Sequence, residues 1–298
     1  VARSIAATAG CPLGAGPYPL RMSASRLVAG SRAVPLFATS EPFGWLGEVM
    51  PRHFTSRMAL HHAELWRHVW SLLPGVRPRP FVGIWSRGGA KSTSAEAAVI
   101  ALGARKRRRY ALYVSRTQEL ADGHVETIGG HLESPEMAAW YPEMATRAVG
   151  KYGQSKGWRR SRLRTSGGFV VDAIGLDTAA RGMKVDSQRP DLIVGDEIDD
   201  DLDTPAQTDK LCRLIAKKLL PMGSQDLAVL FVQNLVHGDS VFARLAGLGA
   251  RPVDFLTNRV LVGPVPAVDG LAVEQTPDGF TVIGGQPKRQ AFGPDRAR

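Results

Sequence analysis

Five short apolar runs, several of them followed by a stretch with helical spacing, dominate the middle of this sequence. They are FVGIW (81–85), YALYVS (110–115), FVVDAIG (169–175), DLIVGD (191–196) and LAVLFVQ (227–233). Strands that are apolar on both faces and alternate with helices are typical of a parallel sheet with helices on both sides. The sequence therefore predicts an α/β fold built on a wound, mainly parallel sheet flanked by helices.

Composition divides the chain into three predicted parts. Residues 1–40 contain four Arg and no Asp, Glu or Lys, so residues 1–45 are predicted to be a disordered or non-native arm. The α/β domain is predicted over 46–250. The Pro- and Gly-rich residues 251–298, with short β segments such as 280–285, are predicted to be a linker or the start of a missing C-terminal nuclease region. Helices are expected where apolar residues recur at intervals of three or four, at 58–72, 92–103, 117–132, 135–149, 205–219 and 240–248.

The net charge of the chain is +10, from 38 Lys and Arg against 28 Asp and Glu. Such an excess favours a polyanionic partner, most often nucleic acid, although a solvated basic surface without a specific partner is the alternative. Cys11 and Cys212 are too few for a disulfide framework, which fits a reducing cytoplasm. No apolar run approaches the ~20 residues that span a bilayer, so no membrane helix is expected.

The stretch SRGGAKST follows the first apolar run and precedes an Ala-rich helix. A phosphate-binding loop needs inward-pointing backbone N–H groups, a helix N-terminus, a lysine for the β- and γ-phosphates and a hydroxyl for Mg²⁺. This stretch supplies all four, although Trp85 and Ala90 stand where the general pattern G-x-x-x-x-G-K-S/T has glycines. An ordinary turn with one lysine is the alternative. The residues predicted to bind nucleotide are Ser86, Arg87, Gly88, Gly89, Ala90, Lys91, Ser92 and Thr93.

The run DLIVGD is followed by a second carboxylate, so that Asp196 and Glu197 lie at the end of an apolar strand, the Walker B arrangement. In α/β folds, ligands bind beyond the carboxyl ends of the strands. Asp196 is predicted to hold Mg²⁺ opposite the Ser92 hydroxyl, and Glu197 to polarise the attacking water as general base. An acidic helix N-terminus is the alternative interpretation.

A third run, LAVLFVQN, ends in Gln233 and Asn234. A polar side chain at this position in phosphate-loop motors senses the γ-phosphate, so Gln233 is predicted to be a catalytic sensor. A strand with a polar end is common by itself. The three motifs in this order together predict a site for ATP with Mg²⁺.

The order of these segments resembles the large subunit of tailed-phage terminases, the DNA-packaging motor. SRGGAKS is similar to that family's phosphate loop, which commonly begins with Ser-Arg or Pro-Arg and has a single glycine before Lys. The segments 111–134, 156–200 and 232–245 resemble three further segments of the family, although Gln233-Asn234 stands where Gly-Thr is frequent. The helix around His61 to Trp66 resembles the entry helix, near which the adenine binds. The resemblance covers roughly residues 50–290.

The resemblance implies a RecA-like P-loop ATPase domain that moves viral double-stranded DNA into a procapsid. It implies a homo-oligomeric ring on a portal, a small terminase subunit as partner, and a phage or prophage protein in the cytoplasm of a bacterial host. Arg87 would act as an arginine finger or charge sensor, with Arg181 as a lesser candidate in a neighbouring subunit. Surface charge alone is the alternative for both arginines.

Members of that family usually continue into an RNase H-like nuclease with metal-binding acidic residues. The segment after residue 251 holds five scattered acidic residues and no acidic triad on strands, so no nuclease activity is expected in this chain. A second interpretation is a prophage-derived nucleic-acid-binding remnant without catalysis, which Ala90 in the phosphate loop motivates.

Two basic segments are predicted to contact DNA phosphates independently of sequence, with one tryptophan available for stacking. For the first segment, 105–109, a solvated helix C-terminus is the alternative. The residues predicted to contact nucleic acid are Arg105, Lys106, Arg107, Arg108, Arg109, Trp158, Arg159, Arg160 and Arg162.

Overall fold

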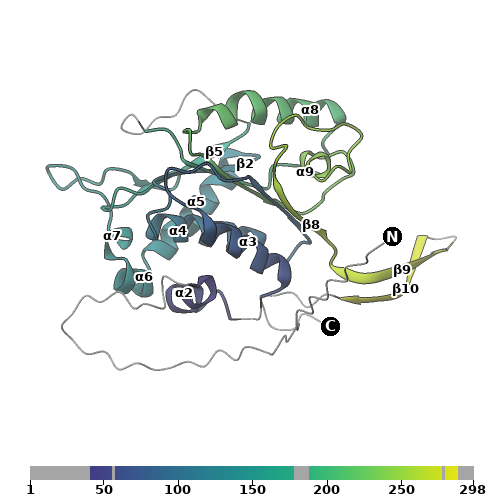
Figure 1. Cartoon of the computed structure of the whole chain (residues 1–298), viewed down its shortest axis with the longest axis horizontal. Helices are drawn as coiled ribbons and strands as arrows, with labels where there is room; N and C mark the ends of the chain where they lie inside the picture. The colour runs from purple at the N-terminus through teal and green to yellow at the C-terminus, as the bar shows by residue number, and fades with distance from the viewer. Residues whose placement is uncertain (1–40, 56–57, 178–187, 277–278, 288–298) are drawn as a thin grey trace, which may run out of the picture. The chain divides into compact units, whose positions relative to one another are not determined.

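The computed structural model describes residues 41–55, 58–177, 188–276 and 279–287, and centres on an eight-stranded sheet (Figure 1). The strand order is β3-β4-β5-β2-β6-β7-β1-β8. Six neighbouring strands, from β5 to β8 in this order, are parallel, whereas β4 and β3 add to the β5 edge in antiparallel pairing. The strands are β1 Phe81–Trp85, β2 Tyr110–Ser115, β3 Trp158–Arg159, β4 Arg162–Arg164, β5 Val170–Gly175, β6 Leu192–Asp196, β7 Ala228–Gln233 and β8 Val260–Val265.

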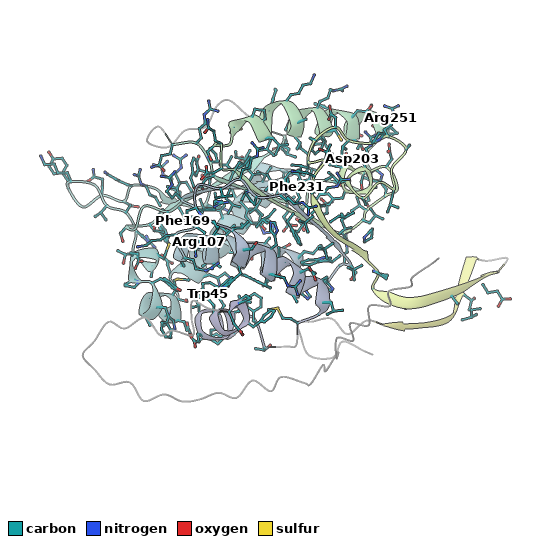
Figure 2. All side chains as sticks on the ribbon, viewed as in Figure 1. Trp45, Arg107, Phe169, Asp203, Phe231 and Arg251 are labelled. Carbon is teal, nitrogen blue, oxygen red and sulfur yellow. The ribbon has the colours of Figure 1, made fainter. Side chains whose placement is uncertain are left out.

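Helices cover both faces of this sheet. The central strands are therefore buried along their whole length. One apolar cluster includes Trp45, Trp66 and Trp85, and the other includes Phe231 and Phe242. Figure 2 labels one residue of each cluster, Trp45 and Phe231. The helices of the first face are α2 Pro42–Val49, α3 Leu60–Ser71, α4 Lys91–Ala104, α5 Gln118–Leu132, α6 Pro135–Trp140 and α7 Pro142–Ala145. The second face carries α8 Pro205–Leu214, a π-helical turn Ile215–Leu219, a 3₁₀ turn Leu220–Met222 and α9 Val241–Leu245.

The wound, mainly parallel α/β sheet that the apolar runs predict is confirmed. The ordered elements extend beyond the predicted domain limits at both ends. Helix α2 begins at Pro42, before the predicted start at residue 46, because Trp45 and Leu46 pack into the core. Strand β8 lies after residue 250 but pairs with β1, so part of the predicted linker belongs to the sheet. Residues 1–40 lie outside the described part of the chain.

Strand β7 lies between β1 and β6, which places three chain segments at one edge of the sheet. The loop after β1, the carboxylates after β6 and the amide side chain at the end of β7 all lie at carboxyl ends of parallel strands. Ile84 is level with Gln233, and Asp196 is level with Val232. One strand, β7, is therefore inserted between the phosphate-loop strand and the acidic strand.

Strands β9 Val268–Thr276 and β10 Gly279–Pro287 form a separate two-stranded antiparallel sheet. Among the helices in the described ranges, none is both long enough and apolar enough to cross a bilayer.

Arg108 shows that the basic run 105–109 is partly a structural element. Its side chain is 1% exposed, and its guanidinium donates hydrogen bonds to the backbone carbonyls of Leu73, Val76 and Arg107. These bonds join the turn after α4 to the segment that leads into β1.

We expect Arg108→Ala to lower the free energy of unfolding by about 3 kcal/mol, because three backbone carbonyl groups lose a buried charged donor. The matched variant Lys106→Ala removes the same charge from an exposed side chain and should change stability by less than about 0.5 kcal/mol. Urea denaturation of both variants measures the difference. Equal stabilities would contradict a structural role for Arg108.

Candidate nucleotide-binding site

The loop between β1 and α4 is a tight turn with two residues in the left-handed region. Gly89 N–H donates to Ser86 O at 3.2 Å, Gly88 has φ +74°, and Ala90 has φ +54° directly before the first residue of α4. Ala90 O then accepts the first helical hydrogen bond, from Ser94 N–H. The backbone therefore adopts a strand–loop–helix path that presents the N-terminus of a 14-residue helix to the carboxyl edge of the sheet.

Ala90 is in a conformation that suits glycine. A left-handed backbone costs an L-residue with a Cβ roughly 1–2 kcal/mol, whereas glycine adopts it without this cost. The sequence indicated only that a methyl group replaces a hydrogen atom near the phosphates. The structure adds a second reason for the glycine in the general pattern, which is the positive φ at this position.

His62, on α3, forms a hydrogen bond to the loop. Its Nε2 lies 2.8 Å from Gly89 O, and its Nδ1 accepts a bond from Ala59 N–H at 3.3 Å. This pair of bonds requires the neutral ring with its proton on Nε2, and burial lowers the pKa of His62 accordingly. The helix predicted to lie near the adenine thus supports the loop through His62, a contact that no sequence pattern signalled.

Lys91 spans the loop that it follows. Its Nζ donates to Ser86 O at 2.8 Å. Burial lowers the pKa of the Lys91 ammonium, while the charges of Asp196 and Glu197 raise it and Arg87 lowers it. The lysine, the two predicted acidic residues and Arg87 therefore interact electrostatically within one site.

Asp196 is fully buried at the end of β6 and is held on one of its two oxygens. Tyr113 Oη donates to its Oδ2 at 3.1 Å, and His124 Nε2 lies 3.8 Å from the same oxygen. His124 stacks on Tyr113 with ring centroids 4.7 Å apart, and its Nδ1 lies 2.7 Å from Glu96 Oε1. Burial lowers the pKa of His124, but the bond to Glu96 and the charge of Asp196 outweigh it and raise this pKa.

The second oxygen of Asp196, Oδ1, is buried and accepts no hydrogen bond from the described residues. Burial raises the pKa of Asp196 to about 6, whereas His124 and the nearby Ser92 hydroxyl lower it. A buried carboxylate oxygen without a partner, beside a hydroxyl, fits a Mg²⁺ ion, which commonly takes one or two protein ligands and completes its shell with phosphates and water. Groups of three or more metal-ligating side chains are absent from the described ranges.

Glu197 is exposed and has φ +54°, so its backbone is strained in the same way as that of Ala90. Its carbonyl oxygen accepts a bond from Arg116 N–H at 3.0 Å. Arg116 also forms a bidentate ion pair with Asp203, with both N–O distances at 2.6 Å. Arg116, directly after β2, therefore bonds to both ends of the acidic loop, which is residues 197–203.

Gln233 holds the same loop from the other side. Its Oε1 accepts from Ile198 N–H at 2.7 Å and from Asp199 N–H at 3.0 Å, and its Nε2 donates to Asp199 O at 3.0 Å. The Asp199 carboxylate in turn accepts from the first two N–H groups of α9, those of Val241 and Phe242. The Gln233 amide is thus bonded to the backbone of the two residues that follow Glu197. We call these three hydrogen bonds the Gln233 clamp.

All three predicted motifs line one cavity of about 560 Å³, a volume within the usual range of ligand sites. Ser86 and Gly89 shape the loop without lining this cavity. The lining residues are Arg87, Gly88, Ala90, Lys91, Ser92, Thr93, Arg116, Leu120, Asp196, Glu197, Asp199, Asp200, Gln233, Asn234 and Val236.

Several of the residues predicted to contact nucleic acid have structural partners. Arg105 stacks on Trp70 at 3.8 Å, Arg108 is buried, and Arg162 pairs with the buried carboxylate of Asp172. Lys106, Arg109, Arg159 and Arg160 are exposed, and Arg107 and Trp158 are half-buried. Arg181 lies outside the described residues.

Sequence reasoning assigned no role to five residues that support the site, His62, Glu96, Tyr113, Arg116 and His124. They come from α3, α4, β2, the turn after β2, and α5. Three of them lie within the segment 111–134 that the resemblance singled out, and His124, two residues after Asp122 in the middle of that match, was a signal that could have drawn attention to them. Their roles depend on how these elements pack, which spacing along the chain does not give.

The strand order and the loop define a P-loop NTPase-type α/β domain. No family model and no curated protein matches the chain. Its structure is similar to the large terminase ATPase domain of Thermus phage P74-26, in a mutant and a further crystal structure, with 11% and 10% identity and a TM-score of 0.46 for each, over 74% of this chain and 86% of those chains. It is also similar to the N-terminal domain of the DNA packaging ATPase from bacteriophage phi29, with 16% identity and a TM-score of 0.34 over 58% of this chain and 82% of that one.

We expect Ala90→Gly to raise the free energy of unfolding by about 1 kcal/mol, because glycine adopts the positive φ without strain. Ala95→Gly is the matched control. Ala95 is buried within α4, where the same substitution should cost about 1 kcal/mol or more. Chemical denaturation compares the two variants. A loss of stability in both would show that the backbone at Ala90 is not strained.

We expect Gln233→Leu to destabilise the protein by about 2 kcal/mol, because two buried N–H groups and one carbonyl lose their partner. Hydrogen exchange should accelerate at the amides of Ile198 and Asp199. Asn234→Leu changes the neighbouring side chain and should leave those two amides protected. Unchanged exchange in Gln233→Leu would contradict the clamp.

Proposed function

We propose that this chain is an ATP-hydrolysing subunit of a motor that moves viral double-stranded DNA into a procapsid. The observation that carries the proposal is the convergence of Lys91, Ser92, Asp196 and Glu197 on one cavity at the carboxyl edge of the sheet. A lysine at a helix N-terminus, a hydroxyl, a buried carboxylate and an exposed carboxylate are the groups that phosphoryl transfer from ATP to water requires.

Each group has one role in this mechanism. The loop and the N-terminus of α4 bind the phosphates, and the Lys91 ammonium leaves Ser86 O to meet the β- and γ-phosphates. The Ser92 hydroxyl and Asp196 would hold Mg²⁺, which neutralises charge on the phosphate oxygens. Tyr113 and His124 keep Asp196 turned so that its other oxygen is available. Arg87, at the loop, would add positive charge beside the γ-phosphate as the bond to the leaving group breaks.

Glu197 would act as the general base for the attacking water. Its carboxylate is exposed in the cavity, and its backbone is held by Arg116 on one side and, through the next two residues, by Gln233 on the other. Gln233 accordingly has a positioning role in the proposal, in place of the direct γ-phosphate contact that the sequence predicts. A change in the Gln233 clamp would move Glu197 and the N-terminus of α9 together, because Asp199 links them.

A second cavity of about 560 Å³ adjoins the first and shares Arg87 and Asn234 with it. Its walls include Leu235, Pro264 and Val265, from the ends of β7 and β8. This gives room at the β8 side of the loop for the nucleoside part of ATP. The charge of +10 supports a DNA partner. The ring on a portal, the small terminase subunit and the host cytoplasm belong to the same proposal and rest on the resemblance.

We expect Glu197→Gln to lower ATP turnover by about 10²- to 10⁴-fold, since the general base is lost, while ATP still binds. Lys91→Ala should abolish binding as well as turnover, because the phosphates lose their main cation. Phosphate release and titration calorimetry with Mg·ATP measure the two quantities, with and without duplex DNA. Lys218→Ala serves as the control of equal charge, because Lys218 lies in the π-helical turn, on the other face of the sheet from α4. The absence of turnover in the wild-type chain would refute the proposal and leave the catalytically inactive remnant. Turnover that survives Lys91→Ala would refute the assignment of hydrolysis to this site.

A further inference from the structure

The segment between α7 and the end of β4 is strongly basic. Residues 147–164 contain seven Lys or Arg and no Asp or Glu, against a net charge of +10 for the whole sequence. The segment leads from α7 to the antiparallel edge of the sheet (Figure 1). We call residues 147–160 the basic arm.

The basic arm is a short antiparallel hairpin joined to the sheet edge. Val149 pairs with Ser155, Lys156 N–H donates to Ala148 O at 2.8 Å, and Arg147 pairs with Thr165. The tip closes through a bond of 2.7 Å from Gly150 N–H to Gln154 O, with Gly153 at φ +80°. The positive φ explains why a glycine is needed in this turn.

The root of the arm is fixed to the central sheet by charge. Arg162, on β4, pairs with the buried carboxylate of Asp172 on β5, and Tyr110 Oη on β2 donates to the same carboxylate at 2.6 Å. Strand β2 is also the neighbour of β6, which ends in Asp196. The arm is therefore connected to the nucleotide site by three adjacent strands.

Part of the arm's charge is used within the molecule and part is not. Arg147 pairs with Glu133, and Arg160 pairs with Glu126 at 3.2 Å. Lys151, Lys156 and Arg159 are exposed, and no acidic side chain of the described residues lies within ion-pair distance of them. Near the tip of the arm, Tyr152 is 84% and Val149 is 61% exposed.

We propose that the basic arm binds the phosphate backbone of double-stranded DNA through Lys151, Lys156 and Arg159, with the Tyr152 hydroxyl as a further phosphate donor. Lysine, arginine and tyrosine side chains are the usual contacts to phosphate, and they carry no sequence information. The inference rests on the proposed function, because it assigns to the motor the element that grips its DNA.

The chemistry of the arm favours a duplex over the other polyanions. Single strands bind on a series of exposed aromatic rings, but Tyr152 is the one fully exposed ring of the arm, while Trp158 is half-buried and lies 5.2 Å from the Arg147 guanidinium. An acidic protein partner would need an apolar centre to its interface, and the arm offers only Val149 and Tyr152. Binding to the regularly spaced phosphates of a duplex needs neither a series of exposed rings nor an apolar centre.

The test compares two triple variants that remove the same charge. One is Lys151→Ala, Lys156→Ala, Arg159→Ala in the arm, and the other is Arg213→Ala, Lys217→Ala, Lys218→Ala on α8 and the π-helical turn, all exposed positions. Fluorescence anisotropy measures their binding to a labelled duplex of mixed sequence and to the corresponding single strand, between about 50 and 200 mM salt and without nucleotide. ATP turnover without DNA is measured on the same samples.

The arm variant should bind the duplex at least tenfold more weakly. The slope of its log K against log salt concentration should be less steep by about 2 to 3, at roughly 0.9 for each phosphate that is no longer neutralised. The control variant should bind like the wild type. Equal weakening in both variants, an unchanged salt dependence in the arm variant, or tighter wild-type binding to the single strand would overturn the proposal. ATP turnover without DNA should be the same in all three proteins. Its absence from the wild type would refute the ATPase while leaving the result on the arm intact.

Discussion

Parallel pairing of β7 between β1 and β6 is the constraint on which the candidate site depends. It brings a loop at residues 86–90, a carboxylate pair at 196–197 and an amide at 233 to one edge, although more than 100 residues separate the first from the second. The Gln233 amide then fastens the acidic loop with three hydrogen bonds, and Asp199 extends this connection to α9. Because these bonds are made to backbone groups, they fix the position of Glu197 without occupying its carboxylate.

Several costly features are gathered in the candidate site. Ala90 and Glu197 both have positive φ, and Asp196 is buried with a pKa raised to about 6. A charged Asp196 therefore costs stability at neutral pH, since its folded-state pKa lies above its ordinary value. Tyr113 and His124 offset part of this cost on one oxygen only. Strain and unsatisfied polar groups gathered in one cavity are expected where a ligand completes the structure.

Arginine has two distinct uses in this chain, and sequence does not separate them. In the run 105–109, Arg108 is buried and bonds backbone carbonyls, whereas Lys106 is exposed. In the segment 156–164, Arg162 pairs with Asp172, whereas Arg159 has no acidic neighbour in the part of the chain that the structure describes. The long stem and five donors of arginine suit both backbone carbonyls within the fold and the phosphates of a bound nucleic acid. A count of arginines in the sequence therefore overestimates the number that are available to DNA.

Sequence alone determined the apolar strands, their alternation with helices and the residue types of the three motifs, because these follow from local periodicity and from strand ends. It also located Lys91, Ser92, Asp196 and Glu197, which all line one cavity. Only the tertiary structure decided that β8 and α2 join the domain, that Gln233 clamps a backbone, and that His62, Tyr113 and His124 support the loop and the buried carboxylate. The reason is physical: a side chain's hydrogen-bond partners depend on strand order and helix packing, which bring together residues that no spacing in the sequence relates.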